Sequence, residues 1–203
     1  LPHCGRGGRD MILGITGGSG CGKTTLLQLL KERGALILDC DEIYHSLLQT
    51  DQAMLRAIDA RFPGVVEDGV LQRKKLGNLV FSDKTALADL NKITHAAVKA
   101  QVKRALETQP ELAAIDAIAL FEGGLAELCD VTVAVTAPLE DRVKRLMTRD
   151  HISEAYARAR IAAQHEDGWF RQRCGFVLAN DGTRETFFDK CLAFLQECGI
   201  MEP

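Results

Sequence analysis

The sequence has no hydrophobic run long enough to cross a membrane. None of its stretches approaches the roughly 18 uninterrupted apolar residues that a spanning helix needs, so we expect no membrane partner. Residues 1–10 also lack the apolar centre of a secretory leader. We expect them to be a tail, disordered or foreign to the natural protein, ahead of a natural start at Met11.

Paired cysteines of the kind that form disulfide frameworks or zinc sites are missing as well. The seven cysteines are an odd number, and none of them forms a Cys-x-x-Cys pair. Thiols without such pairing are mostly buried or incidental, and they favour a reducing compartment. We therefore expect a cytoplasmic protein.

An excess of positive charge is absent too. Lys and Arg total 25 against 28 Asp and Glu, so the formal net charge is −3, and we expect no nucleic-acid partner. The charge is uneven, because residues 142–173 hold eight Lys or Arg against four acids. The sequence also contains no internal repeat and no low-complexity segment.

What is present is an alternation of apolar strands and amphipathic helices. The composition, 46% apolar and 26% charged, is that of a globular protein. Strands are predicted at 11–16, 35–39, 115–121, 131–136 and 176–178, and helices at 22–32, 138–149, 153–165 and 183–198. Such alternation indicates a parallel sheet covered by helices on both faces. Residues 51–109 show helical patterns without a core strand, which predicts a helical insertion.

A glycine-rich loop follows the first predicted strand. Residues 17–24 read Gly-Gly-Ser-Gly-Cys-Gly-Lys-Thr and match the phosphate-binding pattern G-x-x-x-x-G-K-[ST]. Glycine lets consecutive backbone N–H groups curl around a phosphate, and the following helix directs its dipole at the same anion. The expected nucleotide-binding residues are Gly18, Ser19, Gly20, Cys21, Gly22, Lys23, Thr24 and Thr25. The motif predicts ATP and Mg²⁺, with Lys23 reaching the β- and γ-phosphates and the Thr24 hydroxyl coordinating the metal.

Two carboxylates follow the second predicted strand. Asp39 and Asp41 are two residues apart, so in an extended chain both point to one side of the crevice where parallel sheets bind ligands. Phosphorylation of a hydroxyl needs a group that orients it and accepts its proton. We assign this catalytic role to Asp41, with Asp39 as its companion. The alternative is that one of them only caps the helix that starts near Glu42.

A basic helix follows the fourth predicted strand. Arg142, Arg145 and Arg149 lie at i, i+3 and i+7, on one helix face. A charged face is often only solvated, but this one leads into a second basic helix, which indicates a lid that closes over ATP. We expect Arg149 to be catalytic, together with Lys23, and Arg145 to bind the nucleotide.

These motifs resemble those of the dephospho-CoA kinases over nearly the whole chain from Met11. The phosphate loop and the Asp-x-Asp at 39–41 fit that family, and the most telling segments are 69–77, 80–83 and 90–95. Three positions depart from the family pattern: Ala96 and Ile118 replace prolines, and Cys174-Gly175 replaces Ala-Asp. The departures spare the phosphate loop and the two aspartates, so they bear on local backbone shape and not on the chemistry.

The resemblance implies a P-loop NTPase fold of the α/β class, with three layers around a central parallel sheet, a helical acceptor-binding insertion and a small helical lid. The nucleotide-binding core would comprise 11–50, 110–141 and 174–203, the acceptor domain 51–109 and the lid 142–173. The implied activity is ATP-dependent phosphorylation of the ribose 3′-hydroxyl of dephospho-CoA, by a monomer or a weak homo-oligomer. The acceptor-binding residues carried over are Thr16, Asp39, Leu71, Arg73, Lys74, Phe81 and His95.

Some of these residues also fit ordinary structural roles. Arg73 could pair with a phosphate of the acceptor or be a solvated helix charge. His95 could contact the acceptor or hold two helices together through hydrogen bonds. Phe81 is interpreted more readily as a core residue than as a contact.

Other functions stay open from the motifs alone. Uridine and shikimate kinases have similar loops, but the later glycine triplet of shikimate kinases is absent, and the segment from 71 to 95 differs from both. A GTPase switch would carry an Asn-Lys-x-Asp motif, which the sequence lacks. A non-catalytic nucleotide-binding module is disfavoured because Lys23, Thr24 and Asp41 are all retained.

Overall fold

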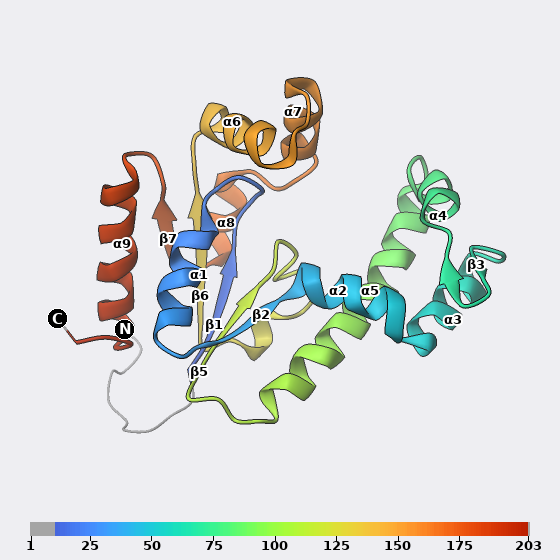
Figure 1. Ribbon diagram of the computed structural model, residues 1–203, viewed down its shortest axis with the longest axis horizontal. Helices are drawn as coiled ribbons and strands as arrows, with labels where there is room; N and C mark the ends of the chain where they lie inside the picture. The colour runs from blue at the N-terminus through green and yellow to red at the C-terminus, as the bar shows by residue number, and fades with distance from the viewer. Residues whose placement is uncertain (1–10, 203) are drawn as a thin grey trace.

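The computed structural model describes residues 11–202, and the tail expected at residues 1–10 lies outside them. Its centre is a five-stranded sheet in the order β2-β5-β1-β6-β7, with every neighbouring pair parallel (Figure 1). The strands are β1 (Met11–Thr16), β2 (Leu36–Asp39), β5 (Leu112–Asp116), β6 (Val131–Thr136) and β7 (Phe176–Ala179). The predicted α/β class and parallel sheet are confirmed.

The third predicted strand was wrong in position. Expected at 115–121, it lies at Leu112–Asp116. The pairing with the two neighbouring strands explains the difference. Asp116 stands opposite Ile15, close to the end of β1, and opposite Asp39, the last residue of β2. The last bond to β1 runs from the backbone N–H of Ala117 to the carbonyl oxygen of Ile15. Beyond this point β1 turns into the glycine loop, so residues 118–121 have no neighbouring strand to pair with, and they form a loop.

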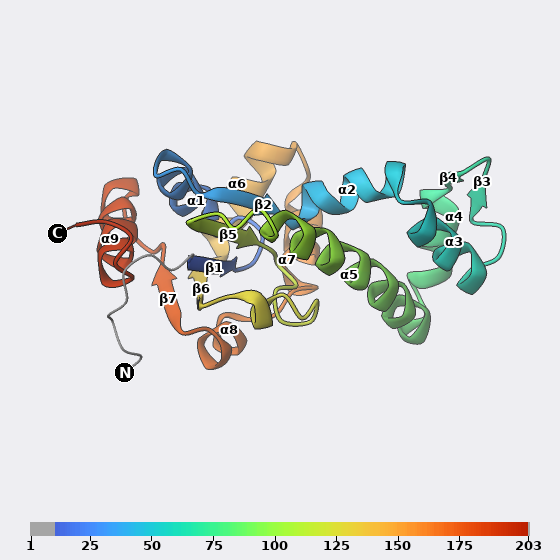
Figure 2. The ribbon, with the colours of Figure 1, turned by 90° about the horizontal axis from the view of Figure 1, so that it is seen from below.

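Helices cover both faces of the sheet. On one face, α1 (Lys23–Glu32) and α9 (Arg184–Glu197) pack over an apolar cluster that contains Leu13 and Ile15 of β1. On the other face, α8 (Asp167–Arg173) contacts β6 and β7, and Figure 2 places α1 and α8 on opposite sides of the sheet. Burial from both sides is the reason why the central strands consist mainly of apolar residues.

The helical insertion extends away from the sheet (Figures 1 and 2). It contains α3 (Gln52–Arg61), a hairpin of β3 (Val66–Glu67) and β4 (Val70–Leu71), α4 (Arg73–Val80) and α5 (Lys84–Leu106). α2 (Cys40–Thr50), which directly follows β2, packs against α3 and α5 as well. The 23 residues of α5 span about 35 Å at 1.5 Å per residue, so this helix links the far end of the insertion to the sheet.

Two short helices, α6 (Leu139–Asp150) and α7 (Glu154–Ala162), stand over the carboxyl edge of the sheet (Figure 1). They share a small apolar cluster of their own, formed by Val143, Leu146, Ala157 and Ile161. His151 ends α6 in the left-handed conformation (φ 53°), and Ser153 caps α7 by accepting the backbone N–H of Tyr156. The helix expected at 153–165 ends early because the residues after Ala162 turn toward the glycine loop.

The remaining helical elements lie close to the sheet. α8 falls within the range expected as the lid, and it packs on β6 and β7. A single 3₁₀ turn, η1 (Ala126–Leu128), precedes β6. Of the helices in residues 11–202, none combines the length and the apolar composition needed to cross a bilayer.

Candidate active site

A large cavity opens at the carboxyl ends of β1, β2 and β5, the edge of a parallel sheet where ligands bind. Its volume is about 1070 Å³. The wall is formed by the glycine loop, the starts of α1 and α2, the middle of α5, the loop after β5, and the two helices α6 and α7. Segments that are far apart in the sequence therefore meet in one site.

The glycine loop has a backbone that glycine adopts most readily. The φ angle is 128° at Gly17, 79° at Gly20 and 96° at Gly22, all in the left-handed region. A Cβ on Gly17 would lie 2.2 Å from the carbonyl oxygen of Val135 in β6, so space requires glycine there as well. Gly22 is the N-cap of α1, and the free N–H groups of the first turn are available to an anion.

Two arginines of α6 hold carbonyl oxygens of the glycine loop. Nε of Arg142 donates to the carbonyl oxygen of Ser19 at 3.0 Å. Nη1 of Arg145 donates to the carbonyl oxygen of Gly20 at 3.1 Å. In a trans peptide unit the N–H points opposite to the C=O, so carbonyls held against α6 leave the adjoining N–H groups directed away from α6.

Two supports of the loop were not anticipated. Arg142 was grouped with the lid arginines, but it is buried, with 6% of its surface exposed. Asn180, which follows β7, donates through Nδ2 to the carbonyl oxygen of Cys21 at 2.8 Å. The helical spacing of the arginines pointed to Arg142, whereas no local pattern connects Asn180 with a loop 159 residues away.

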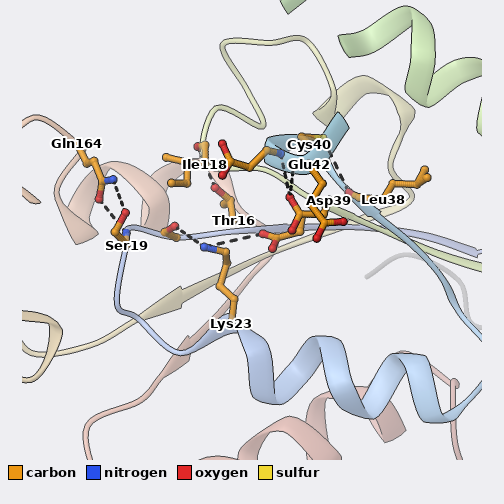
Figure 3. Close-up of polar contacts among 12 residues, drawn as sticks. Thr16, Ser19, Lys23, Leu38, Asp39, Cys40, Glu42, Ile118 and Gln164 are labelled. Carbon is orange, nitrogen blue, oxygen red and sulfur yellow. Dashed lines mark hydrogen bonds and ion pairs between the residues drawn. The ribbon is translucent and has the colours of Figure 1, made fainter. Parts of the chain in front are cut away.

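Lys23 lies at the start of α1 and reaches across the loop. Its Nζ donates to the carbonyl oxygen of Gly17 at 3.2 Å (Figure 3) and lies 3.8 Å from Oδ1 of Asp116. Of the loop residues expected to bind nucleotide, those from Ser19 to Thr24 line the cavity. Gly18 and Thr25 lie outside its wall.

Asp39 and Asp41 have different environments. Oδ1 of Asp39 accepts the backbone N–H groups of Asp41 at 2.9 Å and Glu42 at 3.1 Å, so Asp39 is the N-cap of α2. The expectation that both project from extended chain was wrong, because α2 begins at Cys40. Asp41 has 86% of its side chain exposed and lies 3.9 Å from Nδ1 of His45. Both aspartates still line the same cavity.

Asp116, at the end of β5, is a carboxylate of the cavity that sequence analysis missed. It stands opposite Asp39 in the register of the sheet, and its Oδ1 is buried without a hydrogen-bond partner among the described residues. Burial raises the pKa of this carboxyl to about 6, although the nearby Lys23 acts to lower it. The predicted strand at 115–121 had placed this residue inside the sheet, where a ligand-facing role is not expected.

The outer part of the cavity is bordered by arginines. Arg149 donates to Asp150 through Nε at 2.6 Å and Nη2 at 2.9 Å, and Arg160 donates to the same carboxylate at 2.7 Å. These bonds lower the pKa of Asp150 to about 2. Arg149 and Arg160 both line the cavity, so the cavity side of α6 and α7 carries cations whose charge Asp150 partly offsets.

The expected acceptor-binding residues are distributed over two cavities. His95 of α5 lines the large one. Leu71 and Arg73 border a second cavity of about 220 Å³ at the base of α4. Tyr44 of α2 borders both cavities, so the two spaces adjoin at its side chain.

Three further residues of the expected acceptor site line neither cavity. Lys74 is exposed on α4. Phe81 is 93% exposed, so its interpretation as a core residue was wrong. Thr16 is buried, and its hydroxyl donates to the carbonyl oxygen of Ile118 at 3.1 Å (Figure 3), which ties the end of β1 to the loop after β5.

Comparison with known proteins gives consistent results. A family model described as dephospho-CoA kinase matches residues 11–186. The dephospho-CoA kinase of Moorella thermoacetica is 39% identical over 181 residues, which are 86% of this chain and 85% of that protein. The dephospho-CoA kinase of Deinococcus radiodurans is 37% identical over 193 residues, covering 93% of this chain and 92% of that protein.

Solved structures resemble the fold over most of its length. Dephospho-CoA kinase from Campylobacter jejuni aligns with a TM-score of 0.64 and 25% identity, over 94% of this chain and 98% of that one. TT1252 from Thermus thermophilus aligns with a TM-score of 0.77 and 34% identity, over 93% and 98%. Shikimate kinase from Bacteroides thetaiotaomicron, at 15% identity and a TM-score of 0.52 over 94% and 99%, shares the fold alone.

Proposed function

The chain belongs to the dephospho-CoA kinase family, and we propose that it transfers the γ-phosphoryl group of ATP to the ribose 3′-hydroxyl of dephospho-CoA, giving coenzyme A. The protein is thus a kinase with a P-loop fold. The observation that carries the proposal is that one cavity contains both the glycine loop and Asp41. A phosphoryl donor and a hydroxyl acceptor can therefore meet in the same space.

On the nucleotide side, the glycine loop and Lys23 would hold the phosphates of ATP. Lys23 is positioned for this by its bond to Gly17 and its proximity to Asp116. Arg145 lies within hydrogen-bond distance of the loop backbone, where it supports the cradle and adds positive charge beside it. Fixed donors and cations of this kind stabilise the charge that develops on the transferring group.

The residues at the end of β5 fit a magnesium ion. Mg²⁺ takes oxygen ligands, of which one or two are carboxylates and the others come from water and phosphates. The Thr24 hydroxyl and the Asp116 carboxylate both line the cavity, and Asp116 has a buried oxygen that no described residue bonds. We propose that these two groups hold Mg²⁺, which supplies charge neutralisation at the β- and γ-phosphates.

On the acceptor side, Asp41 would accept the proton of the 3′-hydroxyl as its oxygen bonds to the γ-phosphorus. The bond from that phosphorus to the bridging oxygen breaks, and ADP leaves with the electron pair. Asp41 is well placed because its side chain is free of the capping role that occupies Asp39. Arg149 and Arg160 of the lid would neutralise charge and exclude water when the lid closes.

The family and the fold also support a division of the chain. We propose that the core comprises 11–50, 110–141 and 174–203, that 51–109 binds the acceptor with Leu71, Arg73, Lys74, Phe81 and His95, and that the helices of 142–173 include the lid. We further propose a cytoplasmic enzyme that acts as a monomer or a weak homo-oligomer.

A coupled ADP-release assay with ATP and Mg²⁺ tests the proposal. Dephospho-CoA, uridine and shikimate are offered in parallel, and we expect turnover with dephospho-CoA alone. Treatment of the product with a phosphatase specific for 3′-phosphates then checks whether the phosphoryl group was transferred to the 3′-hydroxyl. Turnover with uridine or shikimate in place of dephospho-CoA would contradict the assigned acceptor, and ATP binding without any turnover would contradict the kinase assignment.

A further inference from the structure

Gln164 makes two hydrogen bonds to a single residue of the glycine loop. Its Oε1 accepts the backbone N–H of Ser19 at 2.9 Å, and its Nε2 donates to Oγ of Ser19 at 2.8 Å (Figure 3). The two atoms of the amide have opposite hydrogen-bonding characters, and both are matched here. A side chain 145 residues away in sequence thus binds both the backbone and the hydroxyl of Ser19.

Arg142 completes the arrangement. Its Nη2 donates to Oε1 of Gln164 at 3.1 Å, while its Nε donates to the carbonyl oxygen of Ser19. The N–H, the carbonyl and the hydroxyl of Ser19 are therefore all bonded by this pair. Both acceptors of Arg142 are neutral, and within residues 11–202 no carboxylate lies at ion-pair distance from it, so its buried charge adds to the attraction for phosphate.

The two side chains stand at the two ends of the lid. Arg142 lies in the first turn of α6, and Gln164 follows α7, so residues 143–163 between them contain α7 and all of α6 after its first turn. These helices share an apolar cluster of their own, which allows them to move as one body. Both ends of that body are fastened to the same residue, Ser19.

The next residue, His165, anchors the segment that carries Gln164 to two other parts of the chain. His165 pairs through Nε2 with Glu122, in the loop after β5, and its ring stacks on Trp169 at 3.8 Å between centroids. The loop after β5 borders the cavity. Residues 164 and 165 therefore join the glycine loop, the lid and the loop that follows β5.

We propose that Gln164 is a positioning residue that couples the lid to the phosphate loop through Ser19. It does not touch the reacting atoms; it sets the angle at which the lid presents Arg149 and Arg160 to the phosphates. Its loss would leave the Ser19 N–H and one N–H of Arg142 without a partner and would free one end of the lid. The inference rests on the proposed kinase function for its kinetic consequence, and on the hydrogen bonds alone for its structural one.

The structural consequence is tested first, by hydrogen exchange of the full chain without ligand. Gln164→Ala should accelerate amide exchange in residues 143–163 at least several-fold and leave α9 and the central strands unchanged. Gln164→Glu keeps acceptors for Ser19 and Arg142, so it should restore slow exchange. Gln172→Ala, an exposed glutamine of α8, is the matched control. Equal lid exchange in wild type and Gln164→Ala would overturn the coupling.

The kinetic consequence is tested with ATP and dephospho-CoA. Gln164→Ala should lower kcat about 10- to 100-fold, the scale of a misplaced catalytic group, while KM for ATP changes much less, as for an interaction that acts on the chemical step. Ser19→Ala should add little in the Gln164→Ala background, because the two side chains act through one bond. An unchanged kcat, or strictly additive losses, would contradict the proposal. If the wild type showed no turnover, the proposed function would be wrong, and hydrogen exchange alone would test the coupling between Gln164 and Ser19.

Discussion

Nζ of Lys23 lies 3.8 Å from Oδ1 of Asp116, and each side chain is only 15% exposed. The pair joins the first turn of α1 to the end of β5, directly beneath the cavity. Among residues 11–202, Lys23 is the cation whose charge acts against the effect of burial on the pKa of Asp116. If Lys23 turned toward the phosphates of ATP, Asp116 would lose this cation, and the proposed Mg²⁺ would take its place.

The first prediction concerns this carboxylate in the reaction. Asp116→Asn keeps the shape of the side chain but removes its charge, so Mg²⁺ should bind less tightly. We expect turnover at subsaturating Mg²⁺ to fall about 10- to 100-fold, as for other residues that support a metal, and to recover partly at higher Mg²⁺. Asp189→Asn, on the exposed face of α9, is the control. The same Mg²⁺ dependence in Asp116→Asn and wild type would exclude Asp116 as a ligand.

The second prediction concerns stability and pH in the protein without ligands. The folded pKa of Asp116, about 6, lies above its ordinary value of 3.8, so the folded state binds the extra proton. Stability from the neutral carboxyl is therefore present below about pH 4 and lost as the pH rises through about 6. The difference in free energy of unfolding between Asp116→Asn and wild type should therefore shift in favour of Asp116→Asn by about 1–3 kcal/mol between pH 4 and pH 7. Urea unfolding at several pH values measures this, and parallel curves for the two proteins would refute it.

The third prediction separates binding from chemistry at Asp41. Asp41→Asn loses the proton acceptor while the helix and the glycine loop stay in place, so turnover should fall by about two to four decades. Affinity for ATP, measured by calorimetry, should change little. Glu42→Gln, the neighbouring residue exposed on α2, should stay close to wild type. Near-normal turnover in Asp41→Asn would show that another group accepts the proton.

The fourth prediction concerns the lid arginine. Arg149→Ala removes a cation from the cavity wall, so kcat should fall about 10²- to 10³-fold, as when a single donor to a developing charge is lost. ATP affinity should be nearly unaffected, since the glycine loop provides the main phosphate contacts. Arg171→Ala, on the exposed side of α8, is the control for a lost surface charge. A drop in ATP affinity with kcat preserved would assign Arg149 to ground-state binding instead.

Much of the site was visible in the sequence where its signal is local. The glycine loop could be predicted because the residue types at 17, 20 and 22 are those that their φ angles demand. The strands β1 and β6 appeared at their observed positions, β1 because of its short apolar run and β6 because of its β-branched residues. The spacing of the arginines in α6 predicted a helix with an arginine face, but it did not show that Arg142 is the one that is buried.

Errors arose where neighbours in space decide the outcome. The limits of β5 follow from where β1 and β2 end, which no property of residues 112–121 reveals. Phe81 carries an aromatic side chain that usually fills a core, yet it lies after α4 at an exposed position. Asp39 and Asp41 were expected to project together from an extended chain, but α2 begins at Cys40, so Asp39 is a helix cap and Asp41 an exposed carboxylate.

Backbone preferences and periodicity along the chain were enough to predict the phosphate loop, the alternation of strands and helices, and hence the fold class. Three contacts of the site became visible only in the folded protein: Asp116 faces Lys23, Asn180 binds the carbonyl of Cys21, and Gln164 binds Ser19. Each of these contacts joins segments far apart in the chain. These contacts depend on the order of strands in the sheet and on the return of the chain from α7 to the glycine loop, and a pattern within a few residues cannot encode either.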